Sequence, residues 1–245
     1  MFRTFLSFAV TIIYLIVTLP VLLYLEIFHR HDRDKKIRVS RPMIRWAFRV
    51  FIKISGMDLT VVGKENIPAD QAVLYICNHR SLFDVIACYP EFDRVTTYIA
   101  KDSLSKIPLF SNWLSFIGCL YFDRDNLRDG IKMLKDAMAL IEDGISVVIF
   151  PEGTRNKNES ELPLLEFHEG SFRIATKTGC PIVPIAIHNM QSVFGAAGSH
   201  NRITPAPVTI EFGKPIDPAS FSKAEQKHLG AHVSGVIEDM LRKYQ

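Results

Sequence analysis

His79 and Asp84, a histidine and an aspartate five residues apart, have the side chains of a general-base pair. In a regular helix, residues five apart point about 140° away from each other, because one turn takes about 3.6 residues. The two can therefore meet only if His79 lies outside the helix that carries Asp84. A carboxylate on one imidazole nitrogen fixes the tautomer and leaves the other nitrogen free to act as a base.

The elements around the pair allow that geometry. The apolar run 72–76 predicts a buried strand, and residues 82–89 predict a helix. With Ser81 as the N-cap, His79 can fold back from the strand end toward the first helical turn. The same residues also fit a purely structural interpretation, because Ser81-x-x-Asp84 resembles a capping box with aspartate in place of glutamate.

Short apolar runs alternate with longer amphipathic segments after residue 58, which is the pattern of an α/β domain. The predicted strands cover 59–62, 72–76, 95–100, 119–122, 146–150, 182–187 and 208–212. The predicted helices cover 82–89, 109–117, 127–142, 171–178 and 224–244.

Charged residues follow three more of these strands. Lys101 follows the strand at 95–100, Asp123-Arg124 follows 119–122, and the run from Pro151 to Arg155 follows 146–150. In open α/β sheets, ligands bind beyond the carboxyl ends of the strands. Three cations at one edge can converge on a phosphate, which arginine binds through two parallel hydrogen bonds. The alternative for each cation is a salt-bridged surface residue.

The N-terminal region is strongly apolar from Thr4 to Phe28. About 20 apolar residues can cross a bilayer, so the segment is long enough to do so. Pro20 can kink a helix near its middle, which makes a hairpin in one leaflet an equal alternative. A cleaved secretory signal is disfavoured by the length of the run and by the lack of a small-x-small cleavage site.

A basic segment follows, and positive charge beside a membrane segment marks the cytoplasmic side. Arg41, Arg45, Arg49 and Lys53 recur every four residues and predict one cationic stripe on a helix. Such a helix can lie among lipid headgroups, or it can pack on the domain as an ordinary surface helix. We expect residues 1–56 to anchor the protein at the cell membrane, with a catalytic domain at 57–245 on the cytoplasmic face.

Composition excludes several classes of function. The 245 residues are 48% hydrophobic and 22% charged, which suits one α/β domain with an appendage. A net charge of +3 is too small to suggest a nucleic-acid partner. No Gly-x-Ser-x-Gly elbow is present, and His79, Asp84 and Glu152 match no metal-ligand signature, so we expect neither a serine hydrolase nor a metal site. The scattered cysteines predict buried free thiols: Cys77, Cys88, Cys119 and Cys180.

Four sequence blocks, in order and at matching spacing, resemble the glycerolipid acyltransferases. The closest resemblance is to the bacterial 1-acylglycerol-3-phosphate acyltransferases, and it covers about residues 56–215. The blocks are Asn78-His79-x4-Asp84, the run from Gly118 to Asp123-Arg124, Phe150 to Arg155 (Phe-Pro-Glu-Gly-Thr-Arg), and the strand with Val183-Pro184. The family's Phe-Lys-x-Gly element appears as Phe167-His168-Glu169-Gly170, with His168 in place of the usual lysine.

The resemblance implies a mixed, mostly parallel sheet flanked by helices. It implies transfer of a fatty acyl group from acyl-CoA or acyl carrier protein to the sn-2 hydroxyl of 1-acyl-glycerol-3-phosphate, which makes phosphatidic acid, with no cofactor beyond the donor. His79 would be the general base and Asp84 would orient it. The acceptor's phosphate and glycerol would be bound by Lys101, Arg124, Glu152, Gly153, Thr154 and Arg155; for Glu152 the alternative is orienting the site.

Three other functions fit parts of the pattern. One is acyl transfer to another lysophospholipid, to glycerol-phosphate or to a lyso-aminolipid. Another is a hydrolase that activates water against a thioester or lipid ester. The third is a non-catalytic lipid-binding membrane protein, which would leave the His79 and Asp84 spacing as a coincidence.

Overall fold

Seven strands form one sheet in the computed structural model, which describes residues 1–123, 125–195 and 202–245. The strands are β1 (Met57–Val62), β2 (Leu74–Cys77), β3 (Thr96–Lys101), β4 (Leu120–Phe122), β5 (Ser146–Ile149), β6 (Ile182–His188) and β7 (Ala206–Phe212). Each matches a predicted strand, with ends that differ by at most two residues.

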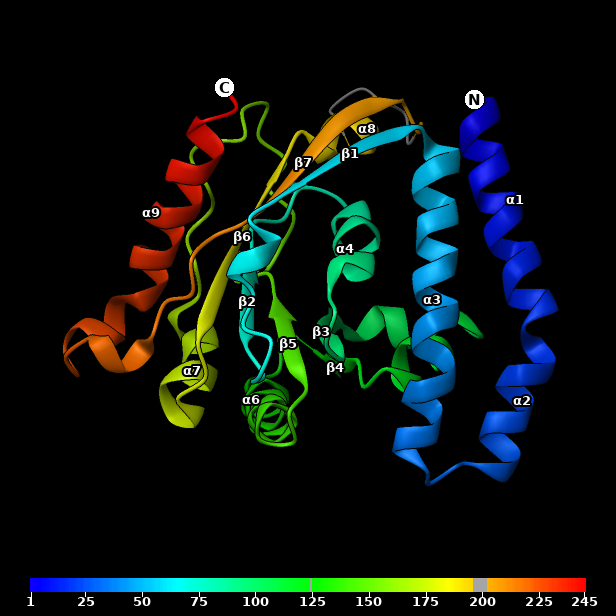
Figure 1. Ribbon diagram of the computed structural model, residues 1–245, viewed down its shortest axis with the longest axis horizontal. Helices are drawn as coiled ribbons and strands as arrows, with labels where there is room; N and C mark the ends of the chain where they lie inside the picture. Colours follow the sequence, from blue (N-terminus) through cyan, green and yellow to red (C-terminus); the bar gives the residue numbers. More distant parts are fainter. Residues whose placement is uncertain (124, 196–201) are drawn as a thin grey trace.

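The sheet order is β1-β7-β6-β2-β5-β3-β4 (Figure 1). Only the β6–β7 pair is antiparallel among the described pairs, so the predicted mixed, mostly parallel sheet is confirmed. The strands β2, β5, β3 and β4 are adjacent and mutually parallel. These are the four strands that precede the charged residues of the sequence, and their carboxyl ends therefore lie along one edge.

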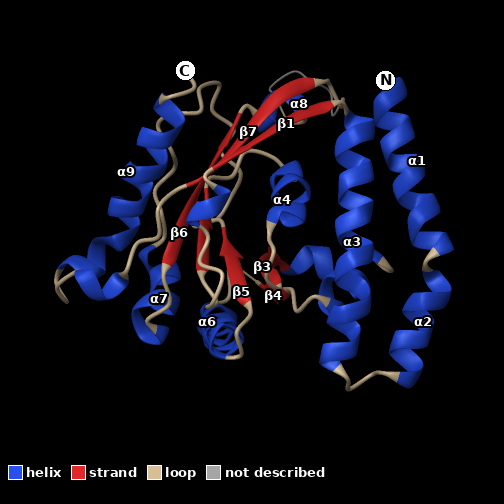
Figure 2. Cartoon of the chain, in the orientation of Figure 1, coloured by secondary structure: helices blue, strands red, loops and turns tan. Residues whose placement is uncertain are grey.

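Helices cover both faces of the sheet (Figure 2). They are α1 (Phe2–Val17), α2 (Leu19–Phe28), α3 (Arg33–Ser55), α4 (Phe83–Cys88), α5 (Phe110–Phe116), α6 (Leu127–Glu142), α7 (Arg173–Thr178), α8 (Met190–Val193) and α9 (Leu229–Arg242). Short 3-10 helices cover Lys64–Asn66, Tyr89–Glu91, Asp102–Lys106, Glu169–Phe172, Pro218–Ser220 and Glu225–His228. The helix predicted at 224–244 thus begins five residues later, after a 3-10 turn.

Two apolar cores lie on the two faces. Successive side chains of a strand point to opposite sides of the sheet. In β2, Tyr75 and Cys77 pack into the core shared with α3, α4 and α5, while Leu74 and Ile76 pack into the core shared with α6, α7 and α9. The strand that leads to His79 is therefore buried on both faces, which fixes its position.

The N-terminal helices α1 and α2 meet at a 42° bend. The break falls at Thr18, and Pro20 sits in the first turn of α2, where its missing N–H costs nothing. In the described part of the chain no single helix combines the length and hydropathy needed to cross a bilayer, although the bent α1–α2 pair does so jointly. Large apolar side chains are exposed along both helices: Phe2, Phe5, Phe8, Ile12, Ile13, Ile16, Val17, Leu23, Tyr24, Ile27 and Phe28.

Helix α3 lies between α1 and the sheet domain (Figure 1). It begins at Arg33, where the Asp32 carboxylate caps the Lys35 N–H, and it continues through Pro42 to Gly56, whose left-handed conformation ends it. Its apolar face packs edge-to-face on the domain, with ring centroids of Phe51 and Phe83 4.9 Å apart.

The cationic stripe of α3 is divided between two environments. The Arg41 Nη2 donates to the backbone carbonyls of Phe92 and Asp93, and the Arg45 Nη2 donates to the carbonyl of Pro90 at 2.6 Å. The expectation that the whole stripe faces lipid is therefore wrong for Arg41 and Arg45, because the domain occupies these guanidinium groups. The other two cations of the stripe, Arg49 and Lys53, are exposed.

Asn78 joins β2 to β6 just beyond the end of β2. Its buried amide donates to the Ile187 carbonyl at 3.0 Å and accepts from the Ile187 N–H at 2.8 Å. We expect Asn78→Ala to lower the free energy of unfolding by about 2–3 kcal/mol, because it leaves two buried backbone groups unpaired. Urea unfolding in neutral detergent, followed by circular dichroism, measures this.

Asn112→Ala is the matched control for this substitution. Asn112 is half-buried on α5 and its side chain makes no hydrogen bond with the described residues. Its removal should change the free energy of unfolding by no more than about 0.5 kcal/mol. Equal losses in the two variants would contradict a structural role for the Asn78 amide.

Candidate active site

The imidazole of His79 is held against the carboxylate of Asp84. His79 Nδ1 lies 2.8 Å from Asp84 Oδ2, and the ring stacks on Phe150 with centroids 4.2 Å apart. The His79 side chain keeps 12% of its surface exposed, whereas Asp84 is completely buried. No described residue bonds Nε2, so this nitrogen is available to take a proton from a bound molecule.

Asp84 is positioned by three donors on one oxygen. Besides the imidazole, its Oδ2 accepts from the backbone N–H groups of Arg80 and Ser81, each at 2.9 Å. Helix α4 begins at Phe83 with Leu82 as its N-cap, so the prediction that Ser81 is the N-cap is wrong. The Ser81 hydroxyl instead accepts from the Phe83 N–H, while the carboxylate still reaches back to the Ser81 N–H as in a capping box.

Glu152 holds His79 through the backbone. It follows β5, the neighbour of β2, and is buried. Its Oε1 accepts from the His79 N–H at 2.6 Å and its Oε2 from the Leu165 N–H at 3.1 Å. Burial raises the pKa of this carboxyl group, and the two backbone donors oppose that shift. Both oxygens are thus occupied, which favours the orienting role over contact with a substrate.

Arg80 is a site residue that the sequence reasoning missed. Its guanidinium is buried and donates to the carbonyls of Ser160 at 3.0 Å and Asn158 at 2.7 Å. Desolvation lowers the pKa of Arg80, although the nearby Glu161 opposes that shift. The Asn156 N–H also donates to the His79 carbonyl at 2.8 Å. These contacts fix the loop that follows Arg155, and nothing in a single sequence marks contacts between residues about 80 positions apart.

The loop after Arg80's contacts carries a second histidine–carboxylate pair. His188 Nδ1, at the end of β6, lies 2.6 Å from Glu161 Oε2, and Glu161 Oε1 accepts from the Asn189 N–H. The His188 ring stacks on Tyr244 near the C-terminus. This pair therefore ties the same loop to β6 and, through the ring, to the end of the chain.

The predicted phosphate-binding cations reach the same edge of the sheet. Lys101 is the last residue of β3, which lies two strands from β2, a separation of about 10 Å. Lys101, Thr154 and Arg155 are all exposed, and their side chains make no ion pair within the described ranges. Arg124 lies outside the described residues.

Gly153 closes the turn after β5. Its N–H donates to the Phe150 carbonyl at 3.1 Å, and its φ of +67° favours glycine. A Cβ at this position would lie 2.8 Å from Nε2 of His168, the residue that replaces the family's lysine. The turn therefore has no room for a side chain unless His168 moves.

Within the described ranges no three His, Cys, Asp or Glu side chains are placed to hold a metal ion. The four cysteines are buried free thiols, as expected. The fold and the site thus define an α/β protein that presents a histidine–aspartate dyad at the carboxyl edge of a parallel sheet, with exposed cations along the same edge.

The chain belongs to the Acyltransferase family, whose model matches residues 58–188. It is 30% identical to a 1-acyl-sn-glycerol-3-phosphate acyltransferase of Cocos nucifera, over 80% of this chain and 62% of that protein. It is 28% identical to a probable 1-acyl-sn-glycerol-3-phosphate acyltransferase of Mycoplasma pneumoniae, over 80% of this chain and 75% of that protein. The chain therefore spans less than two thirds of the Cocos nucifera relative.

A solved structure shows the same fold. The crystal structure of the 1-acyl-sn-glycerophosphate (LPA) acyltransferase PlsC from Thermotoga maritima superposes with a TM-score of 0.80. The alignment covers 99% of this chain and 95% of that one, at 24% identity. The likeness includes the N-terminal helices as well as the sheet domain, because nearly the whole chain is covered.

Glu152 should give the stability of the protein a specific pH dependence. Its folded pKa lies above the ordinary value of 4.5, so the folded state binds this proton more tightly than the unfolded state. That contribution to stability is fully present below pH 4.5 and is lost as the pH rises through the folded pKa. We expect the free energy of unfolding of the unsubstituted protein, relative to Glu152→Gln, to fall over this range.

Urea unfolding at a series of pH values tests this dependence. Glu142→Gln, which changes an exposed glutamate at the end of α6, supplies the baseline. Curves for Glu152→Gln and for the unsubstituted protein that stay parallel with pH would contradict the expected titration.

Proposed function

We propose that this protein transfers a fatty acyl group from an acyl thioester to the sn-2 hydroxyl of 1-acyl-glycerol-3-phosphate, forming phosphatidic acid. The observation that carries the proposal is the His79–Asp84 dyad, with Nδ1 on a buried carboxylate and Nε2 unbonded among the described residues. Family membership supports acyl transfer, and the names of the Cocos nucifera and Mycoplasma pneumoniae relatives support the acceptor.

The dyad can activate the acceptor directly. His79 Nε2 takes the hydroxyl proton while the hydroxyl oxygen bonds to the thioester carbonyl carbon. Collapse of the tetrahedral intermediate breaks the carbon–sulfur bond, and the imidazolium returns its proton to the departing thiolate. Asp84 stabilises the imidazolium in between. General-base catalysis of this kind contributes about a hundred- to ten-thousandfold in rate.

The chain's thiols give no competing covalent route. Cys77 and Cys88, the two cysteines nearest the dyad in sequence, are fully buried, and burial raises the pKa of both thiols. A thiol must be accessible and ionised to accept an acyl group. Direct transfer between the two substrates therefore fits the site better than an acyl-cysteine intermediate.

The acceptor phosphate would bind the exposed cations at the strand ends. Lys101 and Arg155 flank the edge that carries His79, and Arg124 is proposed as a third cation from its sequence position. Thr154 and the backbone of Gly153 would contact the glycerol. The donor would be acyl-CoA or acyl carrier protein, with no further cofactor.

The N-terminal helices would anchor the protein at the cytoplasmic face of the cell membrane. The exposed apolar side chains of α1 and α2 support this, because soluble monomers rarely expose contiguous apolar surface of that extent. We propose residues 1–56 as the anchoring region and 57–245 as the catalytic domain, with the boundary at the left-handed Gly56. Contacts between α3 and the domain hold the two together.

His79→Ala should lower acyl transfer at least about a hundredfold and leave the fold intact, because the half-exposed ring supports no core contact beyond Phe150. A matrix of acyl donors and lysophospholipid acceptors, with products identified by mass spectrometry, measures it. His232→Ala, an exposed histidine on α9, is the control. Substantial transfer by His79→Ala would rule out the base role. Thioester loss without any acceptor would favour a hydrolase instead.

Arg155→Ala should raise the KM for the phosphorylated acceptor about tenfold or more, because a charge-assisted pair with phosphate is lost. The KM for the thioester should stay within about twofold. Steady-state kinetics with each substrate varied in turn separates the two constants. Arg173→Ala, an exposed arginine on α7, is the matched control. An unchanged acceptor KM would show that Arg155 does not bind the phosphate.

A further inference from the structure

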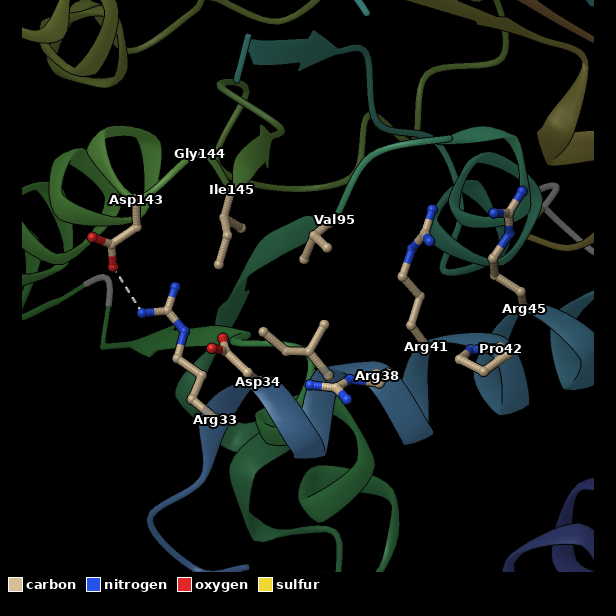
Figure 3. Close-up of a pocket in the computed structure, with 11 residues that line it drawn as sticks. Arg33, Asp34, Arg38, Arg41, Pro42, Arg45, Val95, Asp143, Gly144 and Ile145 are labelled. Atoms are coloured by element: carbon tan, nitrogen blue, oxygen red, sulfur yellow. Dashed lines mark hydrogen bonds and ion pairs between the residues drawn. The ribbon is translucent and has the colours of Figure 1, made fainter. Parts of the chain in front are cut away.

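A cationic cavity lies at the edge of the sheet opposite to His79. It has a volume of about 780 Å³ and is bounded by the N-terminal half of α3 and by the segments that enter β3 and β5. Arg33, Arg38, Arg41 and Arg45 line one side, and Val95 and Gly144 line the other. Figure 3 shows Arg41 and Arg45 extending side by side from α3, with Arg33 reaching Asp143.

Three of these guanidinium groups are held in place with donors to spare. Arg41 bonds backbone carbonyls only through Nη2, and Arg33 bonds Asp143 only through Nη1. Arg45 donates from Nη2 to Pro90, while its buried Nε has no partner among the described residues. Since a guanidinium has five N–H groups, these side chains are preorganised to bind an anion with their remaining donors.

Charge at the cavity also favours an anion. Asp34 and Asp143 are the acidic residues of the lining, so four guanidinium groups face two carboxylates. Arg38 is exposed and makes no bond with the described residues. Desolvation and the positive charge of Arg45 both lower the pKa of Arg41, which means that an anion bound between them would relieve repulsion.

Apolar surface continues directly from the cavity. A second cavity of about 720 Å³ shares Arg33 and Asp34 with the first and is lined by Ile27 and Phe28 from the end of α2. These two side chains are 67% and 70% exposed. A cationic cavity that adjoins exposed apolar side chains is complementary to an amphiphile with an anionic head, whereas a small phosphate would use only the cations.

We propose that this cavity binds the phosphate headgroup of an anionic membrane lipid, with Arg38 and Arg41 on the phosphate and the acyl chains along Ile27 and Phe28. This lipid is distinct from the substrate. Val95 in the cavity and Lys101 at the catalytic edge lie at opposite ends of β3, a strand about 20 Å long. The site would hold the amino edge of the sheet at the membrane surface, independently of the reaction at His79.

Binding of dioctanoyl phosphatidylglycerol to the full chain in neutral detergent tests the proposal, with native mass spectrometry as the readout. We expect one saturable lipid, with affinity about tenfold lower in Arg38→Gln, because a charged hydrogen-bond partner of the phosphate is lost. Arg49→Gln is the matched control, since Arg49 is exposed on the same helix but does not line the cavity. Its affinity should stay within about twofold.

Further arms separate this site from its alternatives. Binding should persist in Arg155→Ala, which removes a cation of the catalytic edge, and loss there would assign the lipid to the acceptor site. Dioctanoyl phosphatidylcholine should bind at least about tenfold more weakly, and equal binding would contradict recognition of negative charge. Displacement of the lipid by inorganic phosphate at equal concentration would show an anion site without lipid preference and overturn the lipid assignment. Equal affinity of Arg38→Gln and the unsubstituted protein would do the same.

Discussion

The active site is organised by a carboxylate that has no contact with solvent. Asp84 is completely buried, and a buried charge costs several kcal/mol unless hydrogen-bond donors surround it. All three donors that reach Asp84 Oδ2 come from residues 79 to 81, the segment directly after β2. To satisfy the charge, the chain must turn sharply at the end of the strand. That turn brings the His79 imidazole onto the carboxylate, so the dyad geometry is a consequence of burying Asp84.

A second buried carboxylate fixes the same histidine from the neighbouring strand. Glu152 binds the backbone N–H of His79, while Asp84 binds its ring. Phe150 covers one face of the imidazole. Backbone, ring nitrogen and ring face are therefore each restrained by a different element, and among the ring's polar atoms only Nε2 is left for a substrate. A base that needs no rearrangement before it acts costs less free energy in the transition state.

The sequence was most informative where the physical signal is local. Alternating apolar runs predicted all seven strands, since burial on two faces demands continuous apolar residues, and the short spacing of His79 and Asp84 predicted their contact. Signals that depend on what lies across space were weaker. The four-residue spacing of Arg41 and Arg45 is the same whether the cations meet headgroups or backbone carbonyls, and only the fold shows that the domain binds them. The contacts of Arg80 with residues 158–160 leave no pattern in one chain.

Helix α3 connects the apolar N-terminal surface to the dyad through very few side chains. On one side it packs against α1, whose outer face is apolar and exposed. On the other side its Phe51 ring packs on Phe83, and Phe83 also stacks on Phe194. Phe83 is the residue before Asp84, the carboxylate that orients His79. Close-packed interiors transmit small displacements, so the position of the imidazole relative to the α1–α2 surface is set by this contact. A catalyst whose acceptor enters from a lipid layer needs that relation to be fixed, and two adjacent residues of α4, one apolar and one acidic, provide it.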